Sequence, residues 1–141
     1  MSVTSVTVDE ILKYLGEQER RKNAVLWTGA YYMGANQTAN LSEPVSAQSN
    51  GIVLIWSAYT DGTPQNHQWQ YTFIPKYHVM AIPGQGVSCV LLGSSFTPIG
   101  SKYVYVYNSK IVGYENNRKA GSANGITYKN NAYVLRKVIG I

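Results

Sequence analysis

The segment from Lys102 to Tyr114 constrains the fold most strongly, because two strand-like runs flank a short turn sequence. Tyrosine and valine alternate through its first half, and both residue types favour the pleated, half-buried surface of a strand. Asn108 and Ser109 then supply a two-residue turn, since asparagine tolerates a positive φ angle better than most residues. The segment therefore predicts a β-hairpin.

The position of the turn determines which residues share a face, because cross-strand partners point the same way. The predicted partners are Tyr107 with Lys110, Tyr105 with Val112, and Tyr103 with Tyr114. The opposite face carries Val104, Val106 and Ile111, which we expect to be the core side. A recognition or interface surface is then predicted at Tyr103, Tyr105, Tyr107, Lys110 and Tyr114. The reverse assignment, with the tyrosines inside, stays open if the hairpin bridges two sheets.

Length and composition indicate one β-rich domain. A chain of 141 residues can bury a core without disulfides or metal. Twelve tyrosines and 13 glycines, with only 13% charged residues, favour many strands joined by turns. We predict a mainly β fold, an antiparallel β-sandwich or jelly-roll-like domain over residues 24–141, preceded by an N-terminal helical arm over residues 1–23.

The arm begins with a helix-start signal. Thr7, followed three positions later by Glu10, matches a capping box. An apolar stripe at helical spacing follows, formed by Val8, Ile11, Leu12 and Leu15. Such a short stripe cannot stabilise an isolated helix. It either packs on its own domain or meets a neighbouring subunit, and for the second case we predict oligomerisation through Ile11, Leu12 and Leu15.

Four further segments predict three strands and one surface loop. Gly51–Tyr59 is apolar on both faces and is predicted to be a central strand. Gln68–Ile74 alternates cleanly, and we expect its aromatic residues Trp69, Tyr71 and Phe73 to point inward. Val87–Leu92 is predicted to be a buried strand. Tyr114–Gly125 is rich in turn residues and is predicted to be a flexible surface loop that carries function.

The sequence offers few residues for catalysis. Cys89 lies in an apolar run and is expected to be a buried structural thiol. His67 and His78 have no second ligand at metal-binding spacing, so each is expected on the surface or in a hydrogen bond. The carboxylates beyond the arm, Glu43, Asp61 and Glu115, fall in turns. We therefore predict no enzyme activity, no catalytic residues, no metal and no cofactor.

The net charge of +5 belongs to the β region, because acidic and basic residues cancel within residues 1–23. This mild excess is expected to serve solubility, and nucleic acid is not the expected partner. The start of the chain lacks the basic region and apolar core of a signal peptide, so export by a general secretory route is not expected. No stretch approaches the ~20 apolar residues of a membrane-spanning helix.

Several sequence blocks, in a consistent order, carry a resemblance to a known family. The blocks are Ala24–Met33, Leu41–Gln48, Gly51–Ser57, Tyr71–Lys76, Lys102–Val106, Lys110–Gly113 and Gly125–Arg136. Through these blocks the chain resembles a small β domain in tail and baseplate proteins of siphophages that infect Gram-positive bacteria. The resemblance implies a β-sandwich related to receptor-binding proteins, and it supplies no catalytic residues.

The resemblance also implies a function, a location and partners. The chain is expected in the virion tail after synthesis in the host cytoplasm, acting without catalysis in host adsorption or in building the tail and baseplate. Its implied partners are other tail proteins, host cell-wall carbohydrate and further copies of itself, with a trimer as the expected assembly. The alternative is a non-virion phage protein that binds nucleic acid or a host protein during infection.

Overall fold

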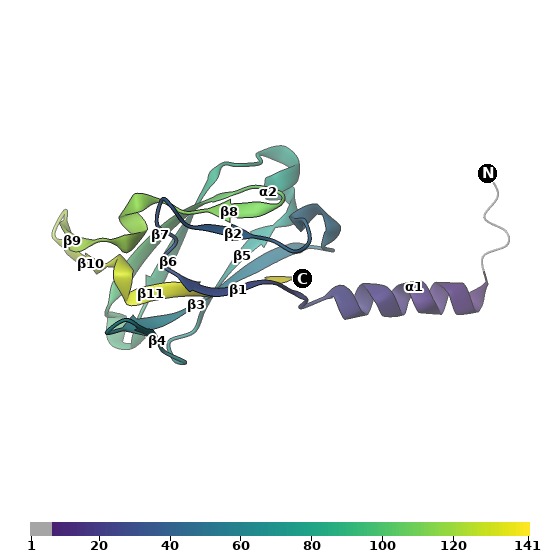
Figure 1. Cartoon of the computed structure of the whole chain (residues 1–141), viewed down its shortest axis with the longest axis horizontal. Helices are drawn as coiled ribbons and strands as arrows, with labels where there is room; N and C mark the ends of the chain where they lie inside the picture. Colours follow the sequence, from purple (N-terminus) through teal and green to yellow (C-terminus); the bar gives the residue numbers. More distant parts are fainter. Residues whose placement is uncertain (1–6) are drawn as a thin grey trace.

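The computed structural model describes residues 7–141, in which a long helix precedes two antiparallel β-sheets (Figure 1). The helices are α1 (Val8–Arg21) and α2 (Lys76–Ala81). The strands are β1 (Val25–Tyr31), β2 (Thr38–Asn40), β3 (Gly51–Thr60), β4 (Thr63–Pro64), β5 (Gln70–Pro75), β6 (Gly86–Leu92), β7 (Ile99–Val106), β8 (Lys110–Val112), β9 (Ala120–Ala123), β10 (Ile126–Lys129) and β11 (Tyr133–Gly140). The 3₁₀ turns are η1 (Val45–Ala47), η2 (Ser94–Phe96), η3 (Glu115–Arg118) and η4 (Asn130–Ala132).

The strands form two main sheets and one separate hairpin. The larger sheet has the order β1-β11-β3, and both β4 and β5 pair with β3 along different parts of its length. The smaller sheet has the order β2-β8-β7-β6, while β9 and β10 pair only with each other. These pairings are all antiparallel. The mainly β, sandwich-like fold behind one N-terminal helix is therefore confirmed.

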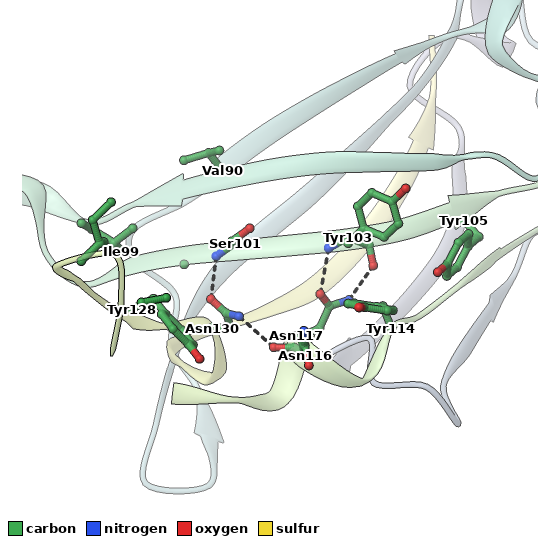
Figure 2. Close-up of a pocket in the computed structure, with 13 residues that line it drawn as sticks. Val90, Ile99, Ser101, Tyr103, Tyr105, Tyr114, Asn116, Asn117, Tyr128 and Asn130 are labelled. Atoms are coloured by element: carbon green, nitrogen blue, oxygen red, sulfur yellow. Dashed lines mark hydrogen bonds between the residues drawn. The ribbon is translucent and has the colours of Figure 1, made fainter. Parts of the chain in front are cut away.

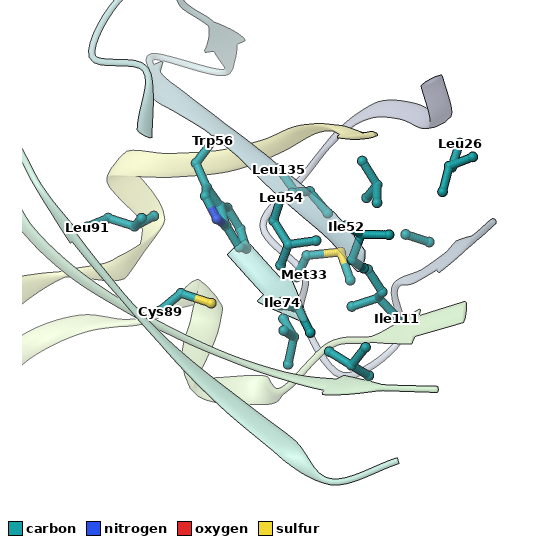
Figure 3. Close-up of a cluster of buried hydrophobic side chains, with 14 of the residues drawn as sticks. Leu26, Met33, Ile52, Leu54, Trp56, Ile74, Cys89, Leu91, Ile111 and Leu135 are labelled. Atoms are coloured by element: carbon teal, nitrogen blue, oxygen red, sulfur yellow. The ribbon is translucent and has the colours of Figure 1, made fainter. Parts of the chain in front are cut away.

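The hydrophobic core lies between the inner faces of the two main sheets (Figure 3). Strand β3 is central in its sheet, as its apolar sequence predicts. The fully buried apolar residues of β3, β7 and β8 are Ile52, Leu54, Trp56, Val104, Val106 and Ile111. Because successive side chains of a strand point to opposite faces, this inner set determines what each strand presents to solvent.

The predicted hairpin has the predicted register next to its turn. The predicted pair of Tyr103 with Tyr114 is absent, because β8 ends at Val112 and the Asn117 side chain bonds the Tyr103 N–H and carbonyl. Tyr105 pairs with Val112, and the Tyr107 N–H donates a hydrogen bond to the Lys110 carbonyl at 2.9 Å. Its valine face is the core face, so the tyrosine side chains of β7 point outward. The reverse assignment of this hairpin is wrong.

Helix α1 projects from the end of the sandwich where β1 begins (Figure 1). The Thr7 hydroxyl accepts a hydrogen bond from the Glu10 N–H at 3.1 Å, which confirms the predicted cap. The apolar stripe faces solvent: the exposed fractions of Val8, Leu12 and Leu15 are 71%, 60% and 55%. Ile11 is exposed as well. The stripe therefore does not pack on its own domain.

The prediction that the aromatic side chains of β5 and the preceding Trp69 point to the core is wrong. Trp69, Tyr71 and Phe73 point outward, with exposed fractions of 41%, 67% and 53%. The register explains the reversal, because Ile74 lies opposite Ile52 and must share its inward direction. The inner positions of β5 are consequently Gln70, Thr72 and Ile74. The predicted alternation of β5 is present, but its aromatic residues lie on the outer face and not on the core face.

Two further expectations need correction. Strand β6 is buried on one face only, since Cys89 and Leu91 point inward while Val90 is 75% exposed. The 114–125 segment is not simply a flexible loop, because it forms η3 and β9 and buries the Asn117 side chain. Helix α2, between β5 and β6, was not predicted at all.

Candidate ligand-binding site

A hollow of about 780 Å³ lies on the outer face of β6 and β7 (Figure 2). The smaller sheet forms its floor, and η3, η4 and the β9–β10 hairpin form its walls. We call it the tyrosine pocket. It is lined by Val90, Ile99, Gly100, Ser101, Tyr103, Tyr105, Tyr114, Asn116, Asn117, Ala123, Ile126, Tyr128 and Asn130.

Three of the predicted tyrosines meet in this pocket. The ring centroids of Tyr103 and Tyr105 are 5.4 Å apart, and those of Tyr103 and Tyr114 are 5.5 Å apart. Their planes cross at 87° and 70°, the edge-to-face arrangement that aromatic quadrupoles favour. Tyr103 and Tyr105 are partly buried, and Tyr114 is 38% exposed. Each ring therefore steadies its neighbours while part of its surface stays open to a ligand.

The other two predicted residues lie outside the pocket. Tyr107 stands beyond the end of the tyrosine cluster, on the same face of the sheet. The Lys110 ammonium lies 5.2 Å from the Tyr107 ring centroid, a cation–π contact at the tip of the hairpin. The predicted set thus divides into three pocket residues and an exposed Tyr107–Lys110 pair.

Two glycines explain why the tyrosine rings can lie flat against the sheet. A Cβ atom on Gly86 would stand 2.1 Å from the Tyr103 ring, and one on Gly84 would stand 2.7 Å from the Tyr107 ring. The backbone of both residues must therefore stay bare for the rings to occupy these places. The Gly84-Gln85-Gly86 sequence is too short for a phosphate loop. Its two glycines leave space for the side chains of Tyr103 and Tyr107.

Asn117 anchors the wall of the pocket to its floor (Figure 2). Its side-chain oxygen accepts a hydrogen bond from the Tyr103 N–H at 2.8 Å, and its amide nitrogen donates to the Tyr103 carbonyl at 2.8 Å. The same nitrogen also donates to the Met33 carbonyl at 2.7 Å. Because one buried side chain satisfies three backbone groups, η3 is fixed to β7 at the residue that carries a pocket tyrosine.

Asn130 anchors a second wall of the pocket, η4, to β7. Its side-chain oxygen accepts from the Ser101 N–H at 2.8 Å, and its amide nitrogen donates to the Asn116 carbonyl at 2.8 Å. The Asn130 backbone N–H donates to the Lys119 carbonyl, which closes the base of the β9–β10 hairpin. The hairpin therefore has a fixed base, and its strand residues other than the half-buried Tyr128 remain exposed.

A fully buried lysine lies beneath the pocket floor, on the core side of β7. The Lys102 ammonium donates to the Tyr32 carbonyl at 3.0 Å and to the Asn117 carbonyl at 2.9 Å. It also lies 5.5 Å from the Tyr32 ring centroid and 5.8 Å from that of Trp56. Burial lowers the pKa of Lys102 to about 7, while the carbonyls and aromatic faces stabilise its charged form.

Sequence reasoning missed most of the wall. Asn116 and Asn117 come from the polar stretch predicted to be a loop, Tyr128 from the strand-like segment after it, and Asn130 from the following turn. Asparagine is so common in turns that its type and position gave no signal of a binding role. From the sequence, Lys102 is only the first residue of the hairpin. Its spacing of two and four residues from Val104 and Val106 is the signal that its side chain shares their core face.

The remaining chemistry-bearing residues lie elsewhere. Cys89 is buried, and burial raises the pKa of its thiol to about 11, as expected for a structural cysteine. The His78 Nε2–H donates to the Gln85 carbonyl, and His67 lies with Asp61 in a second hollow of about 310 Å³. Among residues 7–141, no group of three His, Cys, Asp or Glu side chains gathers as a metal site. No helix of the described chain could span a membrane.

The lining of the tyrosine pocket combines aromatic, apolar and uncharged polar groups. It offers aromatic faces, apolar contacts from Val90, Ile99 and Ile126, and hydrogen-bonding groups from phenols, amides and a serine hydroxyl. The predicted oligomerisation residues Ile11, Leu12 and Leu15 lie on the projecting helix, away from it (Figure 1). No protein-family model matches this sequence, and a comparison with curated proteins finds no relative.

Proposed function

We propose that this chain is a non-enzymatic, phage tail-associated protein that acts in host adsorption or in tail and baseplate assembly. Within that role, the tyrosine pocket recognises carbohydrate of the host cell wall. The observation that carries the proposal is the cluster of Tyr103, Tyr105 and Tyr114 around one hollow on an exposed sheet. The resemblance of several sequence blocks to siphophage tail domains supports the same function.

The chemistry of the pocket favours a sugar. The faces of sugar rings are apolar, so they can stack on tyrosine, while their hydroxyl groups need donors and acceptors at the edge of the rings. A hollow of about 780 Å³ falls within the ~300–1,000 Å³ of small-ligand sites. Lys110 lies outside the hollow, so the geometry favours an uncharged saccharide over contact with a phosphate group.

Binding of the purified chain to host cell walls tests this function. Tyr105→Ser and Tyr114→Ser should each weaken cell-wall binding at least tenfold, because each removes an aromatic surface of the pocket. Tyr107→Ser is the matched control, since it removes an exposed tyrosine of the same strand outside the pocket. Equal binding by all four proteins would contradict the assignment of the pocket.

Location is tested separately by mass spectrometry of purified phage particles. The tail role requires this chain in the mature particle. Its absence from particles would refute that role and favour the alternative, a non-virion phage protein that binds nucleic acid or a host protein. If the chain binds cell walls but is absent from the particle, the pocket assignment stands and only the tail role is refuted.

A further inference from the structure

Two apolar surfaces of this chain face solvent and together suggest how copies assemble. One is the stripe of α1, formed by Val8, Ile11, Leu12 and Leu15. The other is the outer face of the larger sheet, which the corrected direction of β5 makes apolar. We propose that α1 of one copy packs across this outer face on a second copy of the chain.

The outer face of the larger sheet is a continuous apolar surface. Val25, Ile139, Val53 and Phe73 are successive cross-strand partners, so they form one row over β1, β11, β3 and β5. The exposed fractions of Val25 and Phe73 are 50% and 53%. In the next row Ile55 lies beside Tyr71, which is 67% exposed. We call these six residues the outer band.

The dimensions of helix and outer band agree. Helix α1 has 14 residues, which gives it a length of about 21 Å. Four neighbouring strands spaced at about 4.8 Å cover a width of roughly 19 Å. One α1 helix can therefore cross the whole row. Its apolar stripe runs from Val8 to Leu15, a length of about 11 Å, and so lies against two or three of the four strands.

The helix cannot easily reach the outer band of its own copy. The Asn23 N–H donates to the Gly140 carbonyl, and the Gly140 N–H donates to the Ala24 carbonyl, so the chain already belongs to the sheet one residue after Lys22. From this attachment α1 runs outward from the sandwich (Figure 1). Turning back would require a reversal within residues 22–24 and loss of the Asn23 hydrogen bond. Packing of α1 on a second copy keeps the Asn23 hydrogen bond.

Charge and area also fit a second copy. Lys137 is exposed between Thr28 and Ile55 in the second row of the outer face. Glu19, an exposed carboxylate that pairs with Lys22 of its own chain at 3.2 Å, lies one turn beyond Leu15 along the helix stripe. Fully covered aromatic side chains bury ~150–250 Å² each, and aliphatic ones less. The seven exposed side chains, the four of the helix stripe with Val25, Tyr71 and Phe73, would at half burial contribute roughly 600 Å² per contact, and a reciprocal pair roughly 1,200 Å². That area lies within the ~1,200–2,000 Å² of stable interfaces.

The first test is the assembly state of the full chain by analytical ultracentrifugation over a range of concentrations. Ile11→Ser/Leu15→Ser on the helix and Tyr71→Ser/Phe73→Ser on the sheet should each raise the dissociation constant at least tenfold. The control is Tyr77→Ser/Met80→Ser, which removes exposed apolar side chains of α2. A wild-type chain that stays monomeric throughout would overturn the proposal, as would a sheet variant that assembles like the wild type.

The second test identifies the contact and does not depend on destabilising variants. The sequence has one native cysteine, Cys89, and it is buried. Chains carrying Leu12→Cys are mixed with chains carrying Tyr71→Cys and oxidised. A mixed disulfide between the two kinds of chain is expected. Exclusive Leu12→Cys homodimers would instead indicate helix-to-helix pairing and overturn the proposal. So would an intramolecular bridge in the double variant at monomer concentrations.

Discussion

Replacing Asn117 by alanine should destabilise the whole domain and not only the pocket. The substitution leaves two backbone groups without their partner, the N–H and carbonyl of Tyr103. It also removes one of the two donors to the Met33 carbonyl, which keeps its bond from the Tyr114 N–H at 2.9 Å. Each unsatisfied buried group costs ~1–3 kcal/mol. The free energy of unfolding should therefore fall by about 3 kcal/mol or more, a large share of the ~5–15 kcal/mol of a typical domain.

Denaturant unfolding followed by tryptophan fluorescence measures this loss, and thermal unfolding should show it as a fall of about 10 °C in Tm. Asn116→Ala is the matched control, because Asn116 is exposed and its backbone carbonyl keeps its bond to Asn130. That change should stay within about 0.5 kcal/mol. Asn117→Asp keeps the side-chain volume but turns the donor into an oxygen that faces two carbonyls, so it separates lost hydrogen bonds from lost packing.

A loss below about 1 kcal/mol for Asn117→Ala would refute the reasoning, since it would mean that water replaces the amide without penalty. An equal loss for Asn116→Ala would refute it too. If Asn117→Asp were as stable as the wild type at neutral pH, the donated bonds to the Met33 and Tyr103 carbonyls would not be the source of the stability.

Three further predictions follow from the floor of the pocket and the core beneath it. Burial holds the pKa of Lys102 at about 7, against ~10.4 in an unfolded chain, so the unfolded state binds more protons between these values. Through Lys102 the free energy of unfolding should then rise with pH from about 7 towards 9 and be level below 7, and Lys102→Met should flatten this rise in denaturant titrations at several pH values. Above about 9 the raised pKa of the Cys89 thiol, about 11, acts in the opposite direction, so the two proteins are compared below that pH. Gly86→Val should displace the Tyr103 ring and weaken cell-wall binding at least as much as loss of a pocket tyrosine, measured in the same assay. Thr72→Val removes the acceptor of the Trp56 indole N–H, at 3.1 Å, and should lower the free energy of unfolding by ~1–3 kcal/mol in denaturant titrations.

Local chemistry made some of the fold predictable from the sequence. The hairpin register followed from the turn at Asn108 and Ser109, because a two-residue turn leaves no freedom in the pairing beyond it. The start of α1 followed from Thr7, whose hydroxyl makes the expected bond to the Glu10 N–H. In both places the deciding contacts lie within a few residues of each other along the chain.

What could not be predicted depends on partners distant in the sequence. The alternation in β5 gives two faces but not which one is buried, and that choice is made by the pairing of Ile74 with Ile52. The pocket needs Asn117 and Asn130 to reach β7 across the fold, which no local pattern reports. Lys102 is stable in the core because the Tyr32 and Asn117 carbonyls meet its ammonium there.

The place of β11 has a consequence for biosynthesis. This strand, Tyr133–Gly140, is the last of the domain, yet it lies between β1 and β3 and is the partner of β1 in the larger sheet. While the ribosome makes the chain, β1 emerges early and must wait with an unpaired edge until the final strand has left the exit tunnel. The larger sheet can close only after translation has passed residue 140, so pairing between nascent chains competes with folding until that moment.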